Sequence, residues 1–288
     1  MDHAWTRFDA RWNLSPNTLG SEPVFVLAAG WRSGSTLLQR LVCSSGEVLV
    51  WGEPYGRAGL IPALTRSAMA LRDDWPTEGH FPADLDRLQD KWIANLYPPP
   101  EALRGSIEAM LETLLAEPAR ARGFKRFGLK EVRLQALDAR LLHWIYPDAR
   151  FLFLVRNPWD AWSSCKGSEW FLHWPDRIVS TAAQYAVHWR RTVESFLRWP
   201  GDEGILVRYE DMNHPDFDLG YLANHCRLSF IDGSVLEHKL RGMKKPPIPL
   251  TLLETEQIRA AAGELAQICG YEGPTTRPQA QHVARLAP

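Results

Sequence analysis

The stretch that decides the fold is PVFVLAAGWRSGSTLLQRLV, residues 23–42. Its apolar run VFVLAA is typical of a buried strand in a parallel sheet. The two glycines that follow, Gly30 and Gly34, predict a tight turn. Leucines then recur at helical spacing and mark one apolar face of a helix. The stretch therefore predicts a strand, a tight turn and a helix in succession.

The turn GWRSGST has the composition of an anion-binding site. A helix N-terminus offers unpaired backbone N–H groups and a partial positive charge. Ser33, Ser35 and Thr36 add hydroxyl donors, Gly34 permits close backbone approach, and the guanidinium of Arg32 suits an oxyanion. The turn differs from the nucleotide-binding pattern G-x-x-x-x-G-K-[ST], because its glycines are four apart and no lysine precedes Ser35.

Alternating strands and helices predict the rest of the architecture. Further strands are expected in VLVW, RFGLKEV, FLFLV and GILVRYEDM, and helices over residues 134–145, 181–199 and 251–268. This order predicts a three-layer α/β fold with a doubly wound, mainly parallel sheet and helical insertions. Ligands bind at the carboxyl ends of the strands in such sheets. The residues expected at or just past these ends are Gly30, Glu53, Lys130, Arg156 and Arg208.

The 288 residues are long enough for one large domain or two small ones. We expect an N-terminal arm over residues 1–22, a single domain over residues 23–270 and a polar tail over residues 271–288. Within the domain, residues 57–122 form a helical insertion, which we expect to shape an acceptor site.

Composition and charge exclude several classes of protein. Apolar residues make up 45% of the chain and the net charge is −1, so no polybasic attraction to nucleic acid or membrane is expected. The four cysteines form no C-x-x-C pair, which argues against a disulfide framework or zinc site. No apolar leader and no run of about 18 apolar residues is present. We expect a soluble cytoplasmic protein without a metal.

Thirteen tryptophans are many for this length. Packing accounts for most of them, because indole buries a large area. An aromatic acceptor pocket is the alternative, and its candidates are Trp51, Trp75, Trp92, Trp170 and Trp174.

Two motifs together resemble the sulfotransferase family, which uses 3′-phosphoadenosine-5′-phosphosulfate (PAPS) as donor. RSGST after a buried strand resembles the family's 5′-phosphosulfate loop. FLFLVRNPWDAWSS resembles its 3′-phosphate motif, with Arg156 after a strand and Ser164 eight residues later. The likeness covers residues 23–60, 126–168 and 204–212. It implies PAPS as co-substrate, a hydroxyl acceptor and no metal.

The resemblance also implies catalytic roles. Glu53 in WGEPYG follows Arg32 by 21 residues, and a Glu at about this place follows the same loop in the tyrosylprotein and Golgi carbohydrate branch. A partly dry site is expected to raise the pKa of this candidate base. Lys130, with Arg32, would neutralise charge on the leaving oxygen. The cytosolic branch places a catalytic histidine two residues after a lysine, where this chain has Val132. The base is therefore Glu53 or Glu131, and we favour Glu53.

Other residues follow the family less closely. Tyr209 in VRYEDM would contact the adenosine half of PAPS, and Lys244 or Lys245 would close over the 3′-phosphate. His143 and His188 are interpreted as structural, with His188 outside the apolar stripe of its helix. Two alternatives stay open: a kinase or NTPase with a shortened phosphate loop, and a non-catalytic nucleotide-binding module.

Overall fold

One parallel sheet of five strands forms the centre of the molecule. The computed structural model describes residues 2–12, 21–72, 74–82, 85–167, 179–238 and 247–275. Within them the strands are β1 (Val24–Ala28), β2 (Val48–Gly52), β3 (Arg126–Glu131), β4 (Arg150–Val155) and β5 (Gly204–Arg208). Their order across the sheet is β2-β3-β1-β4-β5. All five strands predicted from the sequence are confirmed.

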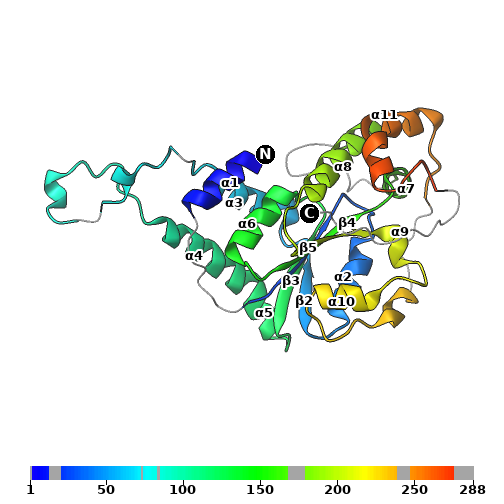
Figure 1. Cartoon of the computed structure of the whole chain (residues 1–288), viewed down its shortest axis with the longest axis horizontal. Coiled ribbons are helices and arrows are strands. Elements are labelled where there is room, and N and C mark those ends of the chain that lie inside the picture. The colour runs from blue at the N-terminus through cyan, green and yellow to red at the C-terminus, as the bar shows by residue number, and fades with distance from the viewer. Residues whose placement is uncertain are drawn as a thin grey trace.

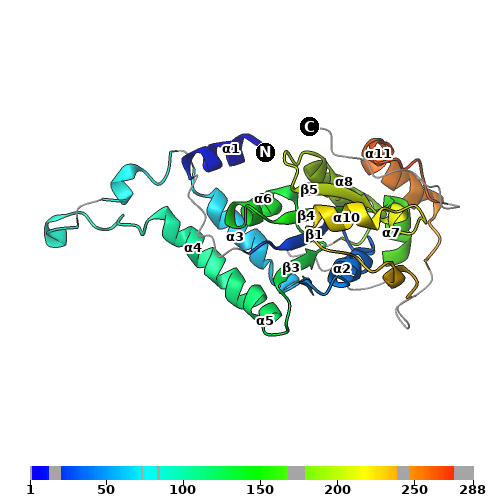
Figure 2. The ribbon, with the colours of Figure 1, turned by 60° about the horizontal axis from the view of Figure 1, so that its bottom comes forward.

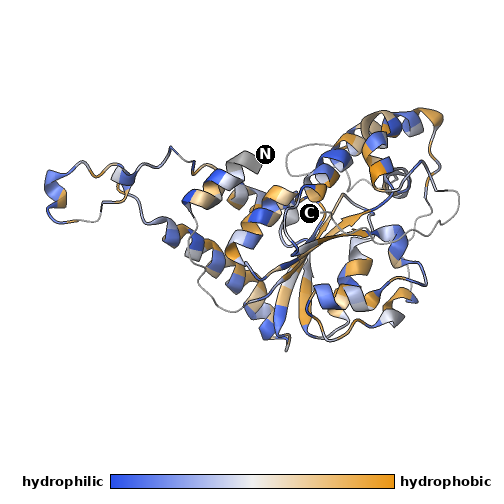
Figure 3. Ribbon diagram, in the orientation of Figure 1, coloured by the Kyte–Doolittle hydropathy of each residue, from blue (hydrophilic) through white to orange (hydrophobic). Residues whose placement is uncertain are grey.

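The central strand β1 is buried along its whole length. It pairs in parallel with β3 on one side and with β4 on the other. Phe25 lies with its ring centroid 5.4 Å from that of Phe151 and 6.4 Å from that of Phe127. Because both faces of such a sheet are covered, its strands read as continuous apolar runs rather than as alternating patterns. Figure 3 shows this concentration of apolar residues in the central strands.

Helices cover both faces of the sheet. Helix α2 (Ser35–Cys43) leads from β1 to β2, whereas α6 (Ala136–Ile145) leads from β3 to β4, in the opposite direction across the sheet. Because crossovers between parallel strands are right-handed, these two helices lie on opposite faces (Figures 1 and 2). The three-layer, doubly wound α/β fold is therefore confirmed.

Helix α8 (Ala182–Leu197) precedes β5, and α11 (Leu252–Ile268) packs along α8 (Figure 1). The remaining α-helices of the described ranges are α1 (Asp2–Arg11), α3 (Leu60–Met69), α4 (Pro100–Leu111), α5 (Glu117–Arg120), α7 (Pro158–Cys165), α9 (Tyr209–Met212) and α10 (Leu219–His225). Among the helices of the described ranges, none is long and apolar enough to cross a bilayer.

Both ends of the described chain pack against the domain. In α1, Trp5 and Phe8 are buried, and the ring of Phe8 lies 5.2 Å from that of Trp144. Beyond α11, Tyr271 is buried and its hydroxyl donates to Oε2 of Glu210 at 2.8 Å. Aromatic side chains from residues 1–22 and 271–288 thus contribute to the core.

The insertion between β2 and β3 includes a long excursion. Residues 74–82 and 85–99 lie away from the body of the molecule, ahead of α4, which begins at Pro100 (Figures 1 and 2). Trp75 and Trp92 lie in this excursion and are 41% and 85% exposed. Trp51, by contrast, donates from Nε1 to the carbonyl oxygen of Leu115 at 2.9 Å, which is a packing role. Trp170 and Trp174 lie outside the described residues.

The two histidines interpreted as structural have partners or are enclosed. His143 contacts Oε1 of Glu203 through Nε2 at 3.0 Å, and this hydrogen bond lowers the pKa of Glu203 to about 2. His188 is only 2% exposed, so its predicted place outside the apolar stripe of α8 is wrong. The buried face of α8 is wider than its apolar stripe and also includes His188, Thr192 and Ser195.

Replacing Gly128 with alanine is expected to destabilise the sheet. A Cβ at Gly128 in β3 would lie 1.9 Å from the carbonyl oxygen of Val24 in β1. Overpacking of this kind costs about 1–3 kcal/mol, so the free energy of unfolding in urea should fall by that amount for Gly128→Ala. Gly79→Ala is the control, because its Cβ would contact only Oγ1 of Thr77, at 3.8 Å. Equal stability of the two variants would contradict the prediction.

Candidate active site

The turn between β1 and α2 has an unusual backbone. Gly30, Arg32 and Gly34 all have positive φ, at 92°, 61° and 90°. At Gly34 a side chain is also excluded sterically, because its Cβ would lie 2.0 Å from Cδ2 of Tyr209. Arg32 adopts the left-handed conformation without being glycine. Strain of this kind is commonly found at functional sites.

The two sequence motifs meet at this turn. Nε of Arg32 donates to Oγ of Ser164 at 3.0 Å, and Nη1 of Arg156 donates to the carbonyl oxygen of Arg32 at 2.6 Å. The sheet explains the meeting, because β1 and β4 are paired neighbours and end at the same edge. Arg156 and Ser164, which follow Arg32 by 124 and 132 positions, are thereby joined to the turn.

Tyr209 closes one side of the turn. Its ring lies 4.3 Å from the guanidinium carbon of Arg156, a cation–π contact, and against Gly34. It comes from α9, which directly follows β5. Arg208, at the end of β5, lies instead over the ring of Tyr271 at 4.7 Å and pairs with Asp211 at 3.7 Å. Of these two residues, Tyr209 is therefore the one in direct contact with the turn.

The start of α7 positions Ser164. Asn157 caps the helix, with its side-chain oxygen accepting from the backbone N–H groups of Trp159 and Asp160. The side-chain nitrogen of Asn157 donates to the carbonyl oxygen of Gly273 at 2.7 Å. Asp160 accepts from the backbone N–H of Thr275 at 3.1 Å and not from Arg156, so the alternative i,i+4 ion pair does not occupy that arginine.

A second cluster lies at the ends of β2 and β3. Nζ of Lys130 is 2.5 Å from Oε1 of Glu53, and Nη1 of Arg133 is 2.9 Å from Oε2 of the same carboxylate. Arg133 also contacts Oε1 of Glu131 at 2.7 Å. The backbone of Glu53 has a positive φ of 49°, and its N–H donates to the carbonyl oxygen of Lys130 at 2.7 Å. Two cations and two carboxylates thus form one network.

The two carboxylates of the network differ in the direction of their pKa shifts and in their access to solvent. Burial by itself would raise the pKa of Glu53, but Lys130 and Arg133 outweigh it and the pKa lies below its ordinary value. The expectation of a raised pKa is therefore wrong. Burial does raise the pKa of Glu131, which is 4% exposed. The side chain of Glu53 is 27% exposed, so it is the carboxylate an acceptor can reach.

Arg133 is a site residue that the sequence analysis did not identify. Its side chain is 8% exposed, and its guanidinium carbon lies 5.2 Å from the ring centroid of Trp31. Trp31 belongs to the anion-binding turn, so this contact joins the turn to the carboxylate cluster. The available signal was the position of Arg133, three residues after Lys130 in GLKEVR at a strand end.

The predicted site residues are therefore brought together at one edge of the sheet. The turn residues Ser33, Ser35 and Thr36 lie at or just before the start of α2, whose first helical residue is Ser35. Lys244 and Lys245 lie outside the described residues. Within the described ranges, no three His, Cys, Asp or Glu side chains converge as a metal site would require, and all four cysteines are free thiols.

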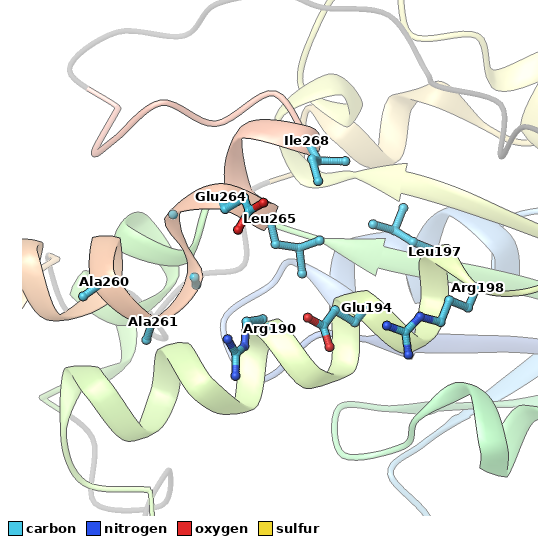
Figure 4. A pocket seen from close by; sticks show the side chains of 11 residues that line it. Arg190, Glu194, Leu197, Arg198, Ala260, Ala261, Glu264, Leu265 and Ile268 are labelled. Atoms are coloured by element: carbon cyan, nitrogen blue, oxygen red, sulfur yellow. The ribbon is translucent and has the colours of Figure 1, made fainter. Parts of the chain in front are cut away.

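Two other cavities contain none of these residues. One, of about 330 Å³, lies between α8 and α11, where Figure 4 shows Arg190, Glu194 and Arg198 along α8 and Leu265 on α11. The other, of about 370 Å³, lies at the base of the excursion and is lined mainly by apolar side chains such as Phe81 and Tyr97.

Comparison with known proteins decides the family. The sequence model of the Sulfotransferase family matches residues 23–232, which begin at the anion-binding strand and include both motifs and the carboxylate cluster. This chain belongs to the sulfotransferase family. That membership supports a sulfotransferase activity and favours it over the kinase or NTPase alternative. No curated protein matches the sequence.

Solved structures similar to this sulfotransferase are distant in sequence. The sulfotransferase domain of the Synechococcus olefin synthase is 18% identical, with 91% of this chain and 99% of that one covered and a TM-score of 0.45. The sulfotransferase domain from the curacin biosynthetic pathway is 16% identical, with 88% and 99% covered and a TM-score of 0.49. A Mycobacterium avium sulfotransferase is 14% identical, with 93% and 83% covered and a TM-score of 0.47.

Removing one cation from the cluster is expected to raise the pKa of Glu53. In Lys130→Met the burial of Glu53 persists while the charge that lowers its pKa most is lost. The carboxyl titration, followed by ¹³C NMR and assigned with Glu53→Gln, should therefore move to higher pH. Lys125→Met, an exposed lysine just before the opposite end of the same strand, is the control. An unchanged titration in Lys130→Met would contradict the electrostatic account.

Proposed function

We propose that this sulfotransferase moves a sulfuryl group from PAPS to a hydroxyl of a small molecule, sugar or peptide. The observation that carries the proposal is the pair of hydrogen bonds that join Arg32 to Ser164 and Arg156 to the backbone of Arg32. They bring the residues of a 5′-phosphosulfate loop and of a 3′-phosphate motif within reach of one nucleotide.

The chemistry of the turn supports an anionic ligand. Oγ of Ser33 and Nε of Arg156 are buried and have no hydrogen-bond partner among the described residues. Buried polar atoms are nearly always paired, and both of these can donate. A phosphate or sulfonate oxygen supplies the matching acceptor. The backbone N–H groups at the start of α2 add the partial positive charge of a helix N-terminus.

PAPS fits this arrangement, with different residues binding its two anionic ends. The turn residues from Arg32 to Thr36 would hold the 5′-phosphosulfate, while Arg156 and Ser164 would hold the 3′-phosphate. Tyr209, which already stacks on Arg156, would contact the adenosine. The hydroxyl of Ser164 accepts from Arg32 in this structure, so its own proton is left to donate to the 3′-phosphate.

The reaction is an in-line displacement at sulfur, analogous to phosphoryl transfer. Glu53 accepts the proton of the acceptor hydroxyl while the acceptor oxygen forms its bond to sulfur. The bond from sulfur to the 5′-phosphate oxygen breaks, which releases adenosine 3′,5′-bisphosphate. Lys130 and Arg32 neutralise the charge that develops on the leaving oxygen.

The lowered pKa of Glu53 is compatible with this role. Lys130 and Arg133 keep the carboxylate ionised at neutral pH, so it is ready to accept a proton. In a loose transition state the protein has little covalent work to do, and positioning matters more than base strength. The fixed bonds from Lys130 and Arg133 to separate oxygens of Glu53 provide that positioning.

Donor specificity tests the nucleotide assignment. Isothermal titration should show tighter binding of adenosine 3′,5′-bisphosphate than of adenosine 5′-phosphate. In Arg156→Ala this preference should fall by about tenfold or more, because charge-assisted hydrogen bonds contribute roughly 1.5–3 kcal/mol. Arg191→Ala, an exposed arginine on α8, is the control and should bind as the wild type does. Equal affinity of the wild type for both nucleotides would remove the assignment.

Turnover tests the base. With an acceptor found by a labelled-sulfate screen over phenols, steroids, sugars and peptides, Glu53→Gln should lower kcat by roughly 10²–10⁴ with bisphosphate binding retained. Glu131→Gln is the matched variant for the other carboxylate of the cluster. If only Glu131→Gln loses turnover, Glu131 is the base; if neither variant does, neither carboxylate is the base. A screen that finds no acceptor, with bisphosphate binding intact, would favour the non-catalytic nucleotide-binding module.

A further inference from the structure

Tyr185 lies beneath the anion-binding turn and has no assigned role. It belongs to α8 and is only 1% exposed. Its hydroxyl has no hydrogen-bond partner among the described residues. The contact it makes is with the first glycine of the turn: a Cβ built on Gly30 would lie 3.4 Å from this hydroxyl. A polar atom is thus buried directly against the segment that would hold the phosphosulfate.

The hydroxyl is held in place by its surroundings. The ring of Tyr185 packs at 5.5 Å against that of Trp162 on α7. One turn further along α8, Nε1 of Trp189 donates to the carbonyl oxygen of Arg156 at 3.0 Å. A capping box between Thr181 and Gln184 begins the helix just before Tyr185. The start of α8 is therefore fixed to the second motif, and the phenol is buried away from solvent.

The state of the hydroxyl makes it a donor. Burial raises the pKa of Tyr185 well above its ordinary value, and Arg156 opposes this only in part, so the phenol keeps its proton at any physiological pH. A buried donor without an acceptor is costly. Ser33, three residues after Gly30 in the same turn, also has a buried hydroxyl without a partner among the described residues. Both hydroxyls adjoin the same turn and can donate to one anion.

We propose that the hydroxyl of Tyr185 is a donor-binding group that hydrogen-bonds an oxygen of the 5′-phosphosulfate held by the turn. The inference rests on the proposed function and adds to it a residue from α8, outside both sequence motifs. Gly30 itself has a positive φ of 92°, which favours glycine at this point of the turn.

Tyr185→Phe tests the proposal, because it removes one oxygen atom and preserves the packing. Isothermal titration should show about tenfold weaker binding of adenosine 3′,5′-bisphosphate to this variant, the effect of losing one hydrogen bond to a charged group. Adenosine 3′-phosphate, which lacks the 5′-group, should bind equally to the variant and the wild type. Tyr146→Phe is the matched control, since Tyr146 is a buried tyrosine just before the opposite, amino end of β4.

Thermal unfolding without ligand supplies the readout that separates binding from packing. Removal of a buried hydroxyl without a partner should leave the Tm of Tyr185→Phe equal to or above that of the wild type. A fall in Tm with unchanged bisphosphate affinity would make Tyr185 structural and overturn the proposal. A wild type that binds no bisphosphate would overturn the proposed function together with this inference, whereas equal binding by wild type and variant overturns the inference alone.

Discussion

The site depends on the position of β1 between β3 and β4. In a parallel sheet all carboxyl ends lie at one edge, so the central strand delivers its turn between the ends of its two neighbours. Arg156, after β4, bonds to the backbone of Arg32, while Arg133, after β3, lies over the ring of Trp31. The turn is therefore clamped from both sides, and its strained, left-handed backbone is held by contacts that come from distant parts of the sequence.

Charge is divided between the two sides of the turn. On the β4 side the cationic groups Arg32 and Arg156 meet no carboxylate in the contacts described above, and hydroxyl donors accompany them. On the β3 side two cations and two carboxylates balance each other in a buried network, and the exposed member of that network is Glu53. A nucleotide with two anionic ends suits the first side, and a neutral acceptor that must lose a proton suits the second. Trp31 and Arg133 connect the two sides.

Much of the fold could be predicted from the sequence, because buried parallel strands are continuous apolar runs and strand-to-helix turns need glycine. The pairing of Arg156 with the turn was also predictable from motif spacing. The direction in which the pKa of Glu53 shifts could not be predicted. Burial raises this pKa and nearby cations lower it, and only the positions of Lys130 and Arg133 decide which effect prevails. His188 was misplaced because the buried face of α8 is wider than its apolar stripe and includes polar side chains.

By itself, the sequence determined the strands, the glycine-containing turn between β1 and α2, and the family likeness. These properties reside in short segments, where local periodicity and spacing carry the information. The tertiary structure alone decided that Arg133 holds Glu53, that Glu131 is enclosed while Glu53 is accessible, and that the hydroxyl of Tyr185 lies against Gly30. Each of these depends on contacts across the sheet between residues tens to hundreds of positions apart, and strand order and burial, which no local pattern encodes, set those contacts.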